Sequence, residues 1–241
     1  MKKRYIFITI LAFFVVAIGV LAWVNADNIK AIYKATQYNT EEIEKQIQES
    51  EKKNTEILQQ YNKENIKPLS EEDSEKLTKG ELTEQEAIDL VLGRTQEPEK
   101  VEEITTNPQQ QPPQQQPEQQ QPQMSVEDED RLGELIAKAY VLKGKYNKLI
   151  SDENYRAASD FYSLPKDQQT KEKKYERGVT FMRNVLRLQD ECDGEMNKIF
   201  TEMTDILKRN NMTTELVDEI KKAYEEEKEL KKAYFVNKYT E

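Results

Sequence analysis

The chain has 241 residues, of which 34% are charged and 36% hydrophobic, and its formal net charge is -10 at pH 7. This composition is too polar for one large compact domain, and the low counts of 7 glycines and 8 prolines disfavour a fold of strands and tight turns. The absence of histidine excludes histidine-dependent triads and histidine-ligated zinc, and the single cysteine excludes an intramolecular disulfide. Because the net charge repels phosphates, we expect no nucleic-acid partner.

The N-terminus carries an apolar run that is long enough to cross a bilayer. Residues 5–24 contain no charge, and as a helix they would extend over about 30 Å, the thickness of the hydrocarbon core. Positions 2–4 are all basic, so the positive-inside rule places residues 1–4 in the cytoplasm and the C-terminal part outside. We therefore expect a single-pass signal-anchor in the plasma membrane. A signal peptide cleaved after Ala26 is the alternative, although its apolar region is usually only about 7–15 residues long.

Residues 25–67 are predicted to form a long juxtamembrane helix, which Pro68 ends. A spacing of four and three residues places apolar side chains at six of ten positions, which indicates a weak coiled-coil seam. Two interpretations remain open: the seam joins parallel copies into a homo-oligomer, or the segment is a single solvated helix. The ten positions are Ile29, Tyr33, Thr36, Thr40, Ile43, Ile47, Ser50, Asn54, Ile57 and Tyr61.

Residues 68–94 are predicted to form a short helical hairpin. Ser70 followed by Asp73, and Thr83 followed by Glu86, have the three-residue spacing of helix caps. The second cap precedes an apolar stripe that consists of Ala87, Ile88, Val91 and Leu92.

Residues 95–124 hold six of the eight prolines, and 108–123 read PQQQPPQQQPEQQQPQ. Such a sequence cannot bury an apolar face and favours extended polyproline-like backbone. We therefore expect a disordered Pro/Gln-rich linker that acts as a spacer.

Residues 125–241 are predicted to form an antiparallel helical bundle, so the predicted fold class is all-α. Ser125 caps a first helix that carries an apolar face up to Ile150, and a short second helix follows and ends before Pro165. A third helix covers 171–209, and a fourth begins after two asparagines. We expect this bundle to fold without residues 27–94. Its predicted core includes Leu132, Leu135, Ile136, Tyr140, Leu142, Tyr146, Tyr155, Phe161, Tyr162, Tyr175, Val179, Val185, Cys192, Met196, Ile199, Phe200, Met203, Ile206, Leu207, Leu216, Val217, Ile220, Leu230 and Tyr234.

No pattern in the chain predicts a catalytic, cofactor-binding or metal site. The acidic run around Gly194 has the wrong residues for a calcium loop, because Gln189 and Phe200 occupy the first and twelfth positions, which are normally acidic. Cys192 lies on an apolar stripe with acidic neighbours, so we expect a buried and unreactive thiol.

We therefore expect a non-catalytic, membrane-anchored extracytoplasmic scaffold or interaction protein of the bacterial cell envelope, with a protein partner bound by the C-terminal helical domain. The span and residues 27–66 are broadly similar to the short coiled-coil division proteins of bacterial envelopes. The main alternative is a sensor or ligand-binding ectodomain that acts through a partner membrane protein. The third hypothesis is an enzyme that uses paired carboxylates.

The predicted orientation can be tested by proteolysis. A protease added to intact cells stripped of their wall should cut within 108–123, because this segment is expected to be exposed and outside. The measurement is the appearance of a C-terminal fragment on an immunoblot. Cleavage that occurs only after lysis would show that the positive-inside argument has assigned the wrong side.

Overall fold

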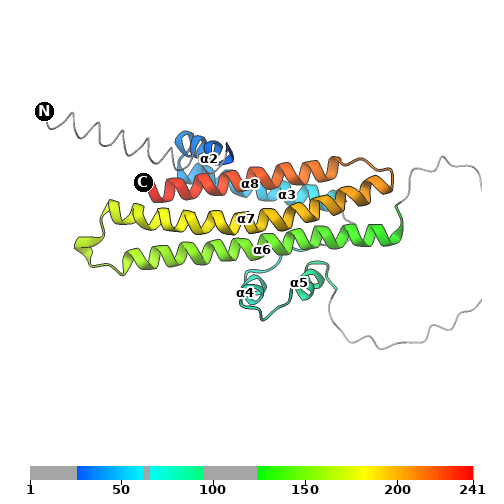
Figure 1. The fold of residues 1–241 in the computed structure, drawn as a ribbon, viewed down its shortest axis with the longest axis horizontal. Helices are drawn as coiled ribbons and strands as arrows, with labels where there is room; N and C mark the ends of the chain where they lie inside the picture. The colour runs from blue at the N-terminus through cyan, green and yellow to red at the C-terminus, as the bar shows by residue number, and fades with distance from the viewer. Residues whose placement is uncertain (1–25, 62–65, 95–123, 241) are drawn as a thin grey trace, which may run out of the picture. The chain divides into compact units, whose positions relative to one another are not determined.

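The computed structural model describes residues 26–61, 66–94 and 124–240, whose regular secondary structure is helical, with no strand among them. The all-α prediction is confirmed. The predicted tail and span at 1–24 and the linker up to residue 123 lie outside the described residues, and no helix within the described part is long and apolar enough to cross a membrane. The helices are α2 (Ala26–Gln37), α3 (Thr40–Tyr61), α4 (Glu71–Lys79), α5 (Glu84–Val91), α6 (Val126–Tyr162), the 3-10 turn η1 (Lys166–Gln168), α7 (Lys171–Arg209) and α8 (Glu215–Thr240) (Figure 1).

The chain divides into two compact units, and each is assembled from segments that are far apart in the sequence. Unit 1 contains Met1–Tyr61, Leu149–Cys192 and Glu215–Glu241, and unit 2 contains Asn62–Lys148 and Asp193–Thr214. The long helices α6 and α7 therefore contribute to both units. The domain boundaries expected at residues 68, 95 and 125 remain predictions.

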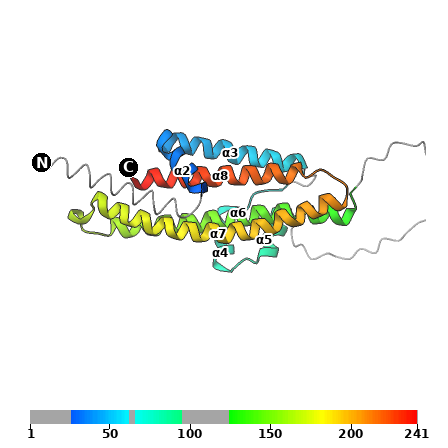
Figure 2. The same ribbon diagram turned by 45° about the horizontal axis from the view of Figure 1, so that its top comes forward.

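In unit 1, the N-terminal helices pack on the C-terminal helix. Ile43 of α3 is fully buried against Leu230 and Ala233 of α8, and α3 lies along α8 (Figure 2). Residues 125–241 were expected to form their own core. Ile43, which lies outside that range, supplies part of the core around α8. The side chains that border this cluster are Ala35, Ile47 and Tyr234.

The other side of α8 packs on α7 through aromatic side chains. Phe181 is 1% exposed, and its ring centroid lies 4.7 Å from that of Phe235 and 5.1 Å from that of Tyr239. Gly178 permits this approach, because a β-carbon added there would lie only 2.6 Å from the β-carbon of Tyr239. Burial raises the pKa of Tyr239 to about 12, and its hydroxyl donates to the Asn154 side chain at 3.1 Å.

In unit 2, α4 and α5 form the predicted hairpin, and α4 lies beside α6 (Figure 1). The Thr83 hydroxyl accepts from the backbone N–H of Glu86, whose carboxylate accepts from the backbone of Thr83, so the expected capping box is confirmed. Gly144 of α6 faces α4, since a β-carbon there would meet the Ser74 hydroxyl at 2.9 Å. The predicted stripe of Ala87, Ile88, Val91 and Leu92 is buried.

The prediction of a single helix over residues 25–67 is wrong, because the helix is interrupted at Tyr38 and Asn39. The Asn39 side chain accepts from the backbone N–H of Glu42 at 2.9 Å, and the Glu42 carboxylate accepts from the Asn39 backbone at 3.0 Å. This reciprocal pair is a capping box with asparagine as the N-cap, which starts α3 as a separate helix.

The helix break expected after Ile150 is also wrong, because α6 is one continuous helix of 37 residues from Val126 to Tyr162. The sequence from Ser151 to Tyr162 contains no glycine or proline that would end the helix. In one continuous helix, the face that contains buried Tyr146 reaches Ala157, so Tyr155 and Tyr162 point away from the core and are exposed.

The predicted core of α7 needs a similar correction near its start. Tyr175 and Val179 are exposed. The buried stripe instead runs through Phe181, Val185 and Leu188 at helical spacing, which turns the two predicted positions toward solvent. From Cys192 to Leu207 the predicted positions are buried as expected; they are Cys192, Met196, Ile199, Phe200, Met203, Ile206 and Leu207.

Replacing Phe181 by alanine should lower the free energy of unfolding by about 3–5 kcal/mol, because the change leaves a cavity between two aromatic rings. Tyr162→Ala is the matched control, and its effect should stay within about 0.5 kcal/mol because that ring is exposed. Urea denaturation followed by circular dichroism measures both. Equal losses would show that Phe181 does not hold α7 and α8 together.

Candidate functional site

A hydrogen-bonded cluster joins the start of α6 to the end of α7 in unit 2. The Arg209 guanidinium donates to both oxygens of the Asp128 carboxylate, from Nε at 3.1 Å, and the Asn210 amide donates to it at 2.6 Å. The Ser125 hydroxyl caps α6 by accepting from the Asp128 backbone. The hydrogen bonds from Arg209 hold the pKa of Asp128 well below its usual range. Arg209 and Asn210 lie at the end of α7 and Asp128 lies at the start of α6, so the cluster joins these two helix ends.

A second set of ion pairs lies on the surface of unit 2. Arg131 of α6 binds both oxygens of Glu202 on α7, at 2.6 and 3.1 Å, and also donates to Glu134 at 3.0 Å. Arg94 contacts the same Glu134 at 3.3 Å. The hydrogen bonds from Arg131 lower the pKa of Glu202. Bidentate pairs of this kind fix the register of two helices, and here they link α6, α7 and the end of the α4–α5 hairpin.

The interface between α3 and α8 contains buried polar groups. Glu227 of α8 accepts from the Asn54 amide at 2.9 Å and from Lys231 at 2.6 Å, and Lys231 also lies 3.4 Å from Glu51. The Oδ1 atom of Asn54 is buried without a hydrogen-bond partner, and the Ser50 side chain is buried nearby on the same helix face. Buried polar groups of this kind fix the register of the two helices, here α3 and α8, at a cost in stability.

The predicted seam on α3 therefore has a partner within the same chain. Ile43, Ile47 and Asn54 were expected to face either another copy or solvent, and they contact α8 instead. On α2 the seam is not continued, because Ile29 and Tyr33 are exposed. The sequence pattern identified the buried face of α3 correctly but did not identify the helix that covers it.

The described residues contain no group of three or more acidic or cysteine side chains placed to hold a metal ion. Cys192 is buried, as its position on the apolar stripe predicted. The acidic run around it lies within α7, so helical backbone replaces the loop geometry that a calcium site requires.

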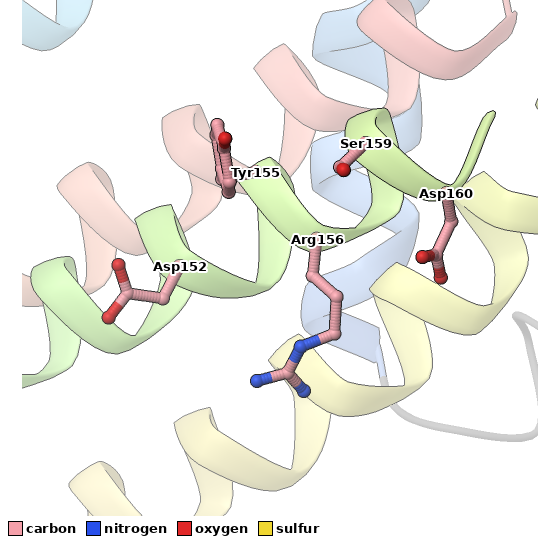
Figure 3. Close-up of a pocket in the computed structure, with 5 residues that line it drawn as sticks. All are labelled: Asp152, Tyr155, Arg156, Ser159 and Asp160. Atoms are coloured by element: carbon pink, nitrogen blue, oxygen red, sulfur yellow. The ribbon is translucent and has the colours of Figure 1, made fainter. Parts of the chain in front are cut away.

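A hollow lies on α6 in unit 1, and Figure 3 shows the five side chains that line it. They spread outward from a single helix, and Arg156 pairs with Glu153 at 2.8 Å rather than with a lining carboxylate. All five lining residues belong to α6, so the hollow offers a contact surface rather than an enclosed binding cavity. The lining residues are Asp152, Tyr155, Arg156, Ser159 and Asp160.

Two tyrosines extend this surface along α6. Tyr155 is 76% exposed and Tyr162 is 69% exposed, and their separation of seven residues places both on one helix face. Phe161 packs edge-on against Tyr162 with ring centroids 5.3 Å apart. The sequence prediction placed both tyrosines in the core. The uninterrupted helical sequence after Ile150 was the signal that would have placed them outside.

Comparisons of the chain with protein families, with curated proteins and with solved structures find no match. The geometry divides the polar and aromatic groups into two classes. Asp128, Glu202 and Glu227 use their charges to join helices. The face of α6 that carries Tyr155 and Tyr162 is exposed and points away from the core, which makes it the candidate functional surface.

The Asp128 cluster predicts a pH-dependent stability. Because the folded pKa of Asp128 is lowered, its contribution is complete above the ordinary aspartate pKa of about 4 and is lost as the pH falls further. The stability difference between the parent protein and Asp128→Asn should therefore be constant near neutral pH and shrink below about pH 4. Asp130→Asn, an exposed position on the same helix, is the control for a general charge effect. A difference that does not change with pH would contradict the assignment.

Proposed function

We propose that this protein is a non-catalytic, membrane-anchored scaffold of the bacterial cell envelope, which binds a protein partner through the outer face of α6. Residues 5–24 form its anchor, residues 95–124 its Pro/Gln spacer, and the helical body lies outside the cytoplasm. The observation that carries the proposal is the pair of exposed tyrosines on one face of α6.

Tyrosine is suited to such a surface because its ring contributes a large apolar area while its hydroxyl stays hydrated. Arg156 and two carboxylates border Tyr155, which gives an aromatic patch with a charged rim, the usual anatomy of a protein interface. The edge-on contact with Phe161 restricts the ring of Tyr162, so less conformational entropy is lost on binding.

Our second proposal is a parallel homo-oligomer that forms through α3, and it requires a conformational change. Ile43 and Ile47 face α8, so a seam between copies must form with α3 released from its own α8. Anchoring raises the effective concentration of such segments in the plane of the membrane, which favours this exchange more in the bilayer than in solution.

The scaffold proposal predicts a site-specific crosslink in cells. A photo-reactive phenylalanine analogue at Tyr155 should give a discrete adduct with a partner, whereas the same analogue at the exposed Glu219 of α8 should give none. Replacing Tyr162 by serine should reduce the adduct formed from position 155, because the patch loses its second ring. The adduct is resolved by immunoblotting and mass spectrometry. Absence of an adduct at 155, or equal labelling at both positions, would contradict the assignment of this face.

A further inference from the structure

Helix α2 presents an apolar face that the described residues of the chain leave uncovered. Ile29 is 54% exposed and Tyr33 is 61% exposed, and their spacing of four residues places them next to each other on one side of the helix. An exposed isoleucine beside an exposed tyrosine marks a surface that suits a partly apolar environment.

The opposite side of α2 packs on α8. Ala31 is buried, and Lys30 and Lys34 both lie 3.3 Å from the carboxylate of Glu229. Just past the end of α2, the backbone oxygen of Tyr38 accepts from the Asn237 amide at 2.8 Å. Because these contacts fix the rotation of α2, the outward direction of Ile29 and Tyr33 is set by the fold.

The uncovered face carries no negative charge, although the chain as a whole carries -10. Residues 29–37 contain two lysines and no acidic residue. The polar side chains beside Tyr33 are hydrogen-bonded to it. Gln37 donates to the Tyr33 hydroxyl at 2.6 Å, and Thr36 donates to the Tyr33 backbone oxygen at 2.8 Å. This face therefore lacks the repulsion from anionic headgroups that the acidic remainder of the chain would meet.

We propose that α2 lies in the outer membrane interface, with Ile29 and Tyr33 inserted among the lipid headgroups and α8 bound to its other side. This inference rests on the proposed anchor, because the apolar run ends at Val24 and Ile29 follows within about 18 Å of chain. Tyrosine favours this depth of the bilayer, and short amphipathic helices lie there with their apolar side down. Two side chains bind lipid weakly, but the anchor holds them at high effective concentration.

Nitroxide labelling of the full-length protein in phosphatidylcholine vesicles tests the proposal. Cys192→Ser removes the native thiol, and single cysteines then replace Tyr33, Ile29 or, as the control, the exposed Tyr155. The label is tested for collisions with oxygen, which concentrates in lipid, and with a water-soluble nickel complex. Labels at positions 29 and 33 should show a severalfold higher ratio of oxygen to nickel collisions than the label at 155, and the ratio should fall to the control value in detergent-free buffer with residues 1–24 deleted.

Equal ratios at positions 33 and 155, with the protein still embedded in the vesicles, would overturn the placement of α2 and leave the anchor proposal intact. Failure of the full-length protein to float with the vesicles would overturn both proposals together. Circular dichroism of each labelled variant confirms that the helices are retained, and Ile29→Ser should lower the ratio at position 33 if the two side chains share one site.

Discussion

The contact of Ile43 with Leu230 and Ala233 is the interaction on which the arrangement of unit 1 depends. Only 36% of the residues are hydrophobic, so the helices have narrow apolar stripes and each stripe has to be covered. The stripe of α8 that faces away from Phe181 is covered by α3. This contact makes the N-terminal helices part of the folded body, although Asn54 and its partner Glu227 are 173 positions apart in the sequence.

The polar groups beside this contact reduce the stability of the interface between α3 and α8. A buried carboxylate and amide lose hydration when α3 docks, and their hydrogen bonds offset that loss only in part. The partnerless Oδ1 of Asn54 adds to the cost. In return, Asn54 pairs with Glu227 in a single register, so a shift of α3 by one turn along α8 would separate them.

Local signals in the sequence were sufficient for much of the fold. The caps at Ser70 and Thr83, the stripe from Ala87 to Leu92 and the end of α7 near Asn210 were all predictable, because they depend on neighbours three or four residues away. The pairing of α3 with α8 was not, because a helical stripe reveals that a face is buried but not what buries it. The exposed tyrosines of α6 were misassigned for a local reason, since a helix break was expected where the chain has no breaking residue.

The break at Tyr38 and Asn39 has a mechanical consequence. A pull applied through the residues before α2 reaches the ion pairs of Glu229 first, and partly exposed ion pairs resist weakly. Helix α2 would then peel from α8, and the load would pass to the bond between Asn237 and the Tyr38 backbone. Because Asn39 and Glu42 cap α3 on their own, α3 keeps its first turn when α2 leaves. Tension on this end is therefore released in steps: α2 separates first, the Ile43 contact is loaded next, and the Asn54–Glu227 hydrogen bond breaks after it.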